Sequence, residues 1–252
     1  MMKIRVMPPI MIVLLLGVCS LSLHASDAEE FQNQGYKSLF NGKNLAGWQI
    51  PEGDNGHWKV VDGVIDYDAR SEAEGDKNLY TEQQFGDFKL HVEWRFKRHS
   101  GLFDMPVILP NGEYARDENG KVVRFPTPNA DSGILIKGAD QANIWCWGVG
   151  SGEIWGTRNN ENLPTEERAK AVPRFHADKP VGQWNAFDIT VKGDRITVRL
   201  NDILVIENCL ISDMPEEGRI GLQHHGGIDE QTGELSGASS LIQFRNLWIK
   251  EL

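Results

Sequence analysis

Apolar and polar side chains alternate without interruption over residues 89–97, which restricts this segment to a β-strand with one buried face. The apolar face carries Leu90, Val92, Trp94 and Phe96, and the polar face carries His91, Glu93 and Arg95. The same period of two recurs at 187–191 and 196–200. The turn signal Lys192-Gly193-Asp194 separates these two runs, so together they predict a hairpin.

Further short strands are predicted at 133–137, 219–223 and 241–250, with tight turns at Asn201-Asp202 and Asp62-Gly63. Helical periodicity is confined to residues 165–171, where Thr165 is the expected N-cap. Many short strands without alternating helices favour an all-β fold in which two antiparallel sheets pack face to face.

One long segment, 100–131, interrupts this pattern and is rich in Pro, Gly, Asn and Asp. Residues 106–125 within it predict a local hairpin that turns at 117–120. A connection of this length is often a binding loop or an active-site lid, and a tolerated surface insertion is the alternative.

The first residues have the layout of a secretory signal peptide, with Lys3 and Arg5 before an apolar run at 10–18 and small residues near position 25. We therefore expect residues 1–25 to be removed and the mature protein to be secreted or periplasmic. Lipid attachment at Cys19 is a less favoured alternative because Val18 precedes it, where Gly, Ala or Ser is usual.

The mature chain is acidic, since removing Lys3 and Arg5 leaves 24 basic against 36 acidic residues, a net charge of about -12. An acidic surface repels phosphate backbones and anionic lipids, so neither nucleic acid nor insertion into a membrane is expected. A small neutral ligand fits the charge better. Cys146 and Cys209 form no disulfide framework; a bridge between them is allowed but not required.

A series of short motifs spans residues 37–252 in a fixed order. They lie at 40–48, 58–65, 79–81, 85–88, 93–95, 131–134, 183–185, 218–223 and 244–247, and include Glu93-Trp94-Arg95 and Asp131-Ser132-Gly133-Ile134. In this order they resemble the 3-keto-disaccharide hydrolase domain family. The resemblance implies one concanavalin-like jelly-roll domain over 37–252 that cleaves glycosides whose C3 hydroxyl has been oxidised to a ketone.

Two features depart from that family. The expected Glu-Val-Gln-Ile-x-Asp type of strand is replaced by residues 141–147, where Asn143 stands for the glutamine and no carboxylate follows. The segment 100–131 is also longer than the family leads us to expect.

A 3-keto sugar has an acidic hydrogen at C2, so cleavage needs a base near C2, a donor near the ketone oxygen and an acid at the leaving oxygen. Water then adds to the product. Glu93 is the predicted base or metal ligand, and Arg95 on the same strand face is expected to hold an oxyanion or a sugar hydroxyl. His91 completes this row. A merely solvated strand face is the alternative.

His225 is the second predicted catalytic residue because histidine transfers protons near neutral pH, and we expect it to share one hollow with Glu93 and Arg95. Gln223 shares its strand face, while a hydrogen-bonded structural histidine is the alternative. The substrate-binding candidates are His91, Gln223, Asn143, Trp145, Glu153 and Ser132. Trp145 offers a flat surface for a pyranose ring, although tryptophan is more often a core residue.

No organic cofactor is evident, and the sequence leaves a divalent metal open. The expected partners are a small oxidised sugar or glycoside and an upstream sugar oxidoreductase. The alternatives to an enzyme are a non-catalytic carbohydrate-binding module on the same sandwich and a structural protein.

Overall fold

The computed structural model describes residues 28–252, so the predicted signal peptide and Cys19 lie outside the described residues. The chain divides into two compact units. In the first, which ends at Tyr36, residues 28–33 are helical. The second, Lys37–Leu252, contains the strands described below.

Within residues 28–252 two antiparallel sheets dominate the second unit. The eight-stranded sheet has the order β13 (Ile203–Leu210), β12 (Arg195–Leu200), β11 (Asn185–Lys192), β6 (Phe88–Phe96), β17 (Ile242–Glu251), β4 (Val64–Asp66) and β3 (Lys59–Val61), with β1 (Lys37–Ser38) also paired to β17. The five-stranded sheet has the order β10 (Asp140–Trp145), β9 (Asp131–Ile136), β14 (Gly218–Leu222), β5 (Leu79–Phe85) and β2 (Trp48–Gln49).

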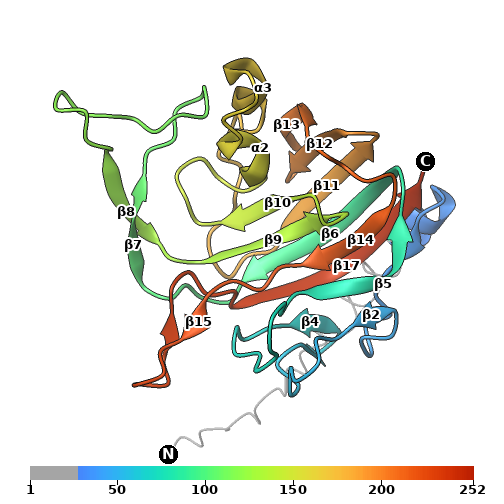
Figure 1. Ribbon diagram of the computed structural model, residues 1–252. Helices are drawn as coiled ribbons and strands as arrows, with labels where there is room; N and C mark the ends of the chain where they lie inside the picture. Colours follow the sequence, from blue (N-terminus) through green and yellow to red (C-terminus); the bar gives the residue numbers. More distant parts are fainter. Residues whose placement is uncertain (1–27) are drawn as a thin grey trace, which may run out of the picture. The chain divides into compact units, whose positions relative to one another are not determined.

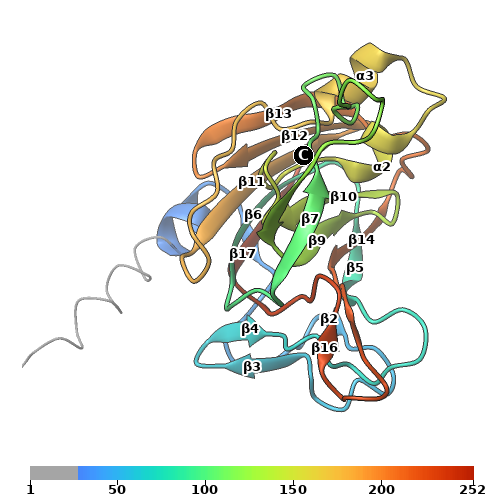
Figure 2. The ribbon, with the colours of Figure 1, turned by 90° about the vertical axis from the view of Figure 1, so that its left-hand side faces the viewer.

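These sheets form two layers, with β9, β10 and β14 in one and β6, β11 and β17 in the other (Figures 1 and 2). Large apolar side chains from both fill the space between them. The alternation along β6 is preserved: Phe88, Leu90, Val92, Trp94 and Phe96 are each at most 3% exposed. The all-β class and the two-sheet antiparallel sandwich are therefore confirmed.

The predicted turns are present. Lys192 pairs with Arg195 across the β11–β12 hairpin. Asp62-Gly63 joins β3 to β4, and both of its residues have positive φ, at 50° and 78°. Turns of that geometry match the right-handed twist of paired strands.

The long segment forms a projecting hairpin of β7 (Leu102–Pro106) and β8 (Arg124–Pro128) (Figure 1). Its tip turns where Gly120 N–H donates to Asp117 O, as predicted. A short pair, β15 (Gly227–Ile228) and β16 (Leu235–Ser236), lies farther along the chain.

Two short helices, α2 (Trp155–Asn159) and α3 (Thr165–Lys170), cover one end of this unit (Figure 1). The helix α3 confirms the predicted helical segment. Its N-cap, however, is Pro164, and no side chain caps it, so the assignment of Thr165 as N-cap is wrong by one residue.

Cys146 and Cys209 are free thiols. No helix in residues 28–252 combines the length and the apolar character needed to cross a membrane.

Candidate functional site

A cavity of about 520 Å³ lies against the outer face of the five-stranded sheet. Its lining comes from the ends of β9, β10 and β14, from α2, from β7 and from the loop after β16: Phe103, Asn129, Asp131, Gln141, Asn143, Trp145, Trp147, Trp155, Gln223, His225, Gly237 and Ala238. A volume of this size is typical of small-molecule sites.

Strand parity brings the polar side chains to this face. Ile134 and Ile136 of β9 point into the core, so Asp131 and Gly133 face outward. Gly133 is paired with Asn143 of β10 and accepts a backbone hydrogen bond from Gln223. Three neighbouring strands thus deliver their polar residues to one place.

Asp131 and His225 form the one acid and base pair in the lining of this described cavity. His225 Nε2 lies 3.8 Å from Asp131 Oδ2. His225 Nδ1 donates to the carbonyl oxygen of Ala238 at 2.7 Å, since a carbonyl can only accept. In the neutral ring this bond fixes the tautomer and leaves the Nε2 lone pair directed toward Asp131.

Asp131 is buried, with its side chain 10% exposed, and burial raises its pKa to about 8. Desolvation disfavours the carboxylate, and the backbone N–H of Ser132 only partly offsets this effect. Its Oδ1 atom has no hydrogen-bond partner among the described residues. At neutral pH Asp131 therefore carries a proton that it can donate.

Amide groups form the floor beside this pair. Gln141 Nε2 donates to Asn143 Oδ1 at 2.5 Å. A Cβ atom at Gly133 would lie 3.0 Å from the Oε1 atoms of both Gln141 and Gln223. A side chain at position 133 would therefore press on both amides, and they would have to shift by a few tenths of an ångström.

Aromatic side chains form the walls. Trp145 and Trp147 stack with ring centroids 3.6 Å apart, and Trp145 donates its indole N–H to Gly150 O. Trp145 is buried, whereas Trp155 and Phe103 are about half exposed. The exposed rings give a flat, apolar surface at the mouth of the cavity.

A polar network supports the strand end that carries Gln223 and His225. His224 lies between them and points to the other side, where its Nδ1 and the hydroxyl of Tyr67 share a 2.6 Å hydrogen bond. Burial raises the pKa of Tyr67 and lowers the pKa of His224 to about 4, so both are uncharged at neutral pH.

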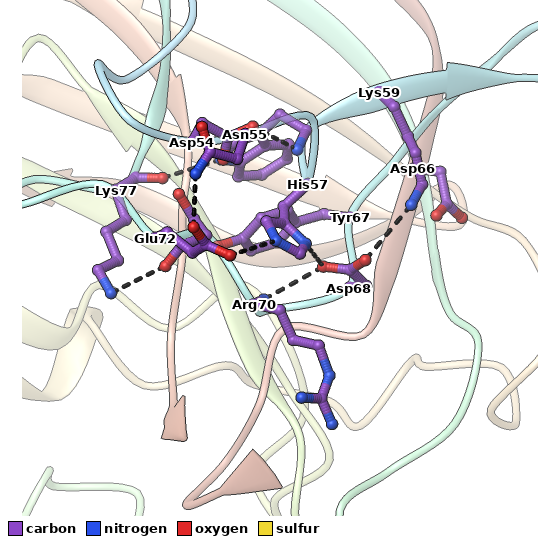
Figure 3. Close-up of polar contacts among 12 residues, drawn as sticks. Asp54, Asn55, His57, Lys59, Asp66, Tyr67, Asp68, Arg70, Glu72 and Lys77 are labelled. Atoms are coloured by element: carbon purple, nitrogen blue, oxygen red, sulfur yellow. Dashed lines mark hydrogen bonds and ion pairs between the residues drawn. The ribbon is translucent and has the colours of Figure 1, made fainter. Parts of the chain in front are cut away.

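Tyr67 is itself fixed from its other side. Its ring stacks on Trp58 at 3.8 Å, and the backbone N–H of Trp58 donates to Asp54. Figure 3 shows the surrounding cluster, in which His57 Nδ1 lies 2.9 Å from Asp68 Oδ1. The partner of His224, Tyr67, is thus itself held by packing against Trp58.

The sequence-based expectation that Glu93 and Arg95 share a hollow with His225 is wrong. Glu93 belongs to the eight-stranded sheet and faces away from the core, as parity requires. Its carboxylate accepts hydrogen bonds from Arg245 Nε at 2.7 Å and Asn246 Nδ2 at 2.8 Å. Glu93 therefore has a structural role, because it bonds to two residues of β17, the strand paired with β6.

Arg95 and His91, the other polar residues of this strand face, also contact neighbouring side chains on the same outer surface. Arg95 Nε donates to Gln243 Oε1, and its guanidinium lies 4.5 Å from the ring centroid of Trp184. His91 Nδ1 lies 2.8 Å from Asp188 Oδ1. None of these side chains lines the cavity.

Two further candidates do not reach the cavity. Ser132 is fully buried on the core side of β9, and its hydroxyl donates to Gln223 O. Glu153 is also fully buried and forms an ion pair with Arg158. By contrast, the structure does bring His225, Gln223, Asn143 and Trp145 together.

Asp131 was missed as a site residue at the level of sequence. It was visible as the first residue of the Asp131-Ser132-Gly133-Ile134 motif, and the parity of that strand was the available signal. Because Ile134 is apolar, Ser132 had to share its buried side and Asp131 had to face outward.

Across the described chain, no group of three or more His, Cys, Asp or Glu side chains is placed to hold a metal ion. The cavity itself offers one carboxyl group, one imidazole and several amide oxygens. Hard cations accept carboxylate and amide oxygens, so Asp131, Gln141 and Gln223 are the residues available to such an ion.

Comparison with known proteins relates the chain to a family. Residues 35–250 match the family model described as "3-keto-alpha-glucoside-1,2-lyase-like domain". No match is found among curated proteins. Two solved structures from Parabacteroides distasonis ATCC 8503, each described as a "putative glycosyl hydrolase", have similar folds.

The first is 22% identical with a TM-score of 0.51, and the match covers 86% of this chain and 84% of that one. The second is 18% identical with a TM-score of 0.52, and covers 89% and 97%. At such identities these likenesses establish the shared fold.

Proposed function

The chain belongs to the family of 3-keto-alpha-glucoside-1,2-lyase-like domains, and we propose that it cleaves 3-keto-glycosides in the cavity lined by Asp131 and His225. The observation that carries the proposal is the facing pair itself. A histidine nitrogen with a free lone pair lies 3.8 Å from a carboxyl group that burial keeps protonated.

The ketone at C3 makes elimination accessible. A base removes the hydrogen from C2, and the electron pair moves toward C3 to give an enolate stabilised by the ketone oxygen. The C1–O bond then breaks, a double bond forms between C1 and C2, and the departing oxygen takes a proton to leave as an alcohol. This route does not require the paired carboxylates of ordinary glycoside hydrolysis.

His225 is the proposed base. Its Nδ1–H is committed to Ala238 O, so only Nε2 can accept the C2 hydrogen. The loop carbonyl acts as the orienting group that a catalytic histidine needs.

Asp131 is the proposed acid at the leaving oxygen. Its raised pKa keeps the proton available at pH 7, where an ordinary aspartate would have lost it. Elimination then leaves His225 protonated and Asp131 ionised, and the resulting opposite charges stabilise each other across the short gap.

The rest of the cavity fits a neutral ring. The amides of Gln141, Asn143 and Gln223 are hydrogen-bonding groups for the ketone oxygen and hydroxyls. The exposed rings of Trp155 and Phe103 suit the apolar faces of a pyranose.

In the full proposed cycle, water adds across the C1–C2 double bond, with its hydroxyl going to C1 and its hydrogen to C2. The net reaction is then hydrolysis. A pure lyase would stop at the unsaturated 3-keto sugar, and identification of the product distinguishes the two.

The test is to incubate the purified protein with a 3-keto disaccharide and, separately, with its unoxidised parent, and to identify the products. We expect release of sugar from the ketone alone. Asp131→Asn and His225→Ala should abolish release, whereas the matched control Glu93→Gln, from the other sheet, should retain it. Binding of the ketone without any release would instead favour a non-catalytic carbohydrate-binding module.

The substrate must be supplied by an enzyme that oxidises a sugar hydroxyl at C3, so a sugar oxidoreductase acting earlier remains part of the proposal. Secretion through the signal sequence also remains a prediction. N-terminal sequencing of the protein recovered from culture medium or periplasm tests it.

A further inference from the structure

A second cavity, of about 320 Å³, opens at one end of the sandwich, between the two sheets. Trp94 and Phe96 enter it from the core-facing side of β6, and Trp145 and Cys146 from the end of β10. The remaining lining comes from Pro128, from Asn185 at the start of β11 and from the preceding segment: His176, Asp178, Lys179, Pro180, Val181 and Gln183. Trp145 lines both cavities.

Two of these lining residues carry buried polar atoms without a partner in the described part of the chain. The indole N–H of Trp94, a residue 2% exposed, donates to nothing. The Asp178 side chain is 10% exposed; its Oδ2 accepts from Ser151 N–H, but its Oδ1 accepts no hydrogen bond. Buried polar groups are normally paired, and such exceptions often mark a place where a ligand or water belongs.

We propose that this inter-sheet cavity is a second binding site, for a small uncharged ring compound that carries a hydroxyl group, such as a phenol. The ring packs between Trp94, Phe96 and Trp145. Its hydroxyl accepts the indole N–H and donates to Asp178, because a hydroxyl group both donates and accepts. One orphaned donor and one orphaned acceptor thus receive partners from a single chemical group.

Other ligand classes fit less well. An ammonium group has no lone pair to accept the Trp94 N–H. A free sugar carries hydroxyls all round its ring, whereas apolar side chains such as Phe96, Pro128 and Val181 offer them no hydrogen-bond partner, and each buried unpaired hydroxyl is costly.

This site goes beyond the proposed cleavage reaction and does not depend on it. If the reaction is as proposed, its leaving group is itself an alcohol or phenol, and a released phenolic group would have the chemistry of this cavity. That connection alone rests on the proposed function.

The experiment is calorimetric titration of the purified protein, without sugar, using 4-methylphenol and toluene as probes. We expect one 4-methylphenol per chain and about tenfold weaker binding of toluene, the difference typical of a hydrogen bond to a buried partner. No binding of 4-methylphenol, or equal affinity for the two probes, overturns the proposal.

Variants locate the bound probe. Val181→Trp places a large side chain in the cavity from a residue 39% exposed, and should weaken binding about tenfold or more. Val61→Trp changes an equally exposed valine on β3, away from both cavities, and should leave affinity unchanged. Thermal unfolding verifies that both variants are folded.

Two further variants separate the two cavities. Trp94→Phe removes the donor but keeps an aromatic ring, and should reduce the preference for 4-methylphenol over toluene. Trp155→Ala alters only the first cavity and should leave 4-methylphenol affinity within about twofold of the unsubstituted protein. Loss of binding in Trp155→Ala together with retention in Val181→Trp would place the probe in the first cavity and refute the second site.

Discussion

Replacement of Asp131 by asparagine should remove activity and, at the same time, stabilise the folded protein at alkaline pH. The side chain is buried, and burial raises its pKa from 3.8 to about 8. Between these values the folded protein keeps a proton that the unfolded chain has released. The free energy of unfolding therefore falls as pH rises through this window, and it stops falling above about pH 8.

The size of the effect follows from the shift. Each unit of pKa difference corresponds to about 1.4 kcal/mol, so the cost of ionising Asp131 in the folded state is roughly 5 kcal/mol at pH 8 and about 6 kcal/mol well above it. Asparagine does not titrate, and the cost of burying its amide is nearly independent of pH. The variant's advantage over the unsubstituted protein should thus grow by about 4 kcal/mol between pH 5 and pH 8.

The assay is urea unfolding of both proteins at several pH values from 5 to 8, together with the pH profile of cleavage. Glu234→Gln, which removes an exposed carboxylate, is the matched control for the loss of one charge. We expect cleavage by the unsubstituted protein to decline as pH rises through about 8. If the stability difference between Asp131→Asn and the unsubstituted protein stays constant with pH, Asp131 is not held protonated and its role as an acid has no basis.

Three further substitutions test other parts of the site. His225→Ala should lower kcat at least about 100-fold with little change in Tm, because the side chain is half exposed; near-normal kcat would reject His225 as the base. Glu93→Gln should cost about 1–3 kcal/mol in urea unfolding, since Arg245 loses a charged partner, and should leave kcat within about twofold; a selective loss of kcat would restore Glu93 as a catalytic candidate. Tyr67→Phe should destabilise by about 1–3 kcal/mol because the buried His224 nitrogen loses its partner, and an unchanged urea midpoint would mean that this bond does not hold the strand end.

Local pattern was sufficient for most of the fold. Period-two alternation located β6, β11 and β12, and the turn signals located the reversals between paired strands. These features depend on residues close in sequence, where parity and backbone preference act directly. The cap of α3 was misplaced by one residue because proline at position 164 also fits a helix start, and no side-chain bond distinguishes Thr165.

The candidate site was predicted only where one strand carried the information. Gln223 and His225 share a face because they are two residues apart, and the cavity contains both. The prediction that Glu93 lies beside His225 was wrong for a different reason. The alternation correctly predicted that the Glu93 side chain points away from the core. It could not show which sheet contains the strand, and therefore on which outer surface Glu93 lies. That choice depends on pairing between β6 and β17, whose partners Glu93 and Arg245 lie 152 residues apart.

The same reasoning explains why the catalytic pair could not be assembled from local pattern. Asp131 opens β9, whereas His225 follows β14, and they meet because Ile134 pairs with Leu222 across the two strands. A slip of one residue in that pairing would turn Gln223 into the core and bring Leu222 to the cavity. Gly133 lies where the amides of Gln141 and Gln223 approach the strand, so a side chain there would have to move the ends of both. The glycine in the Ser-Gly-Ile motif leaves room for the side chains of Gln141 and Gln223 over the strand. The register between β9 and β14 brings Asp131 and His225 to the same cavity.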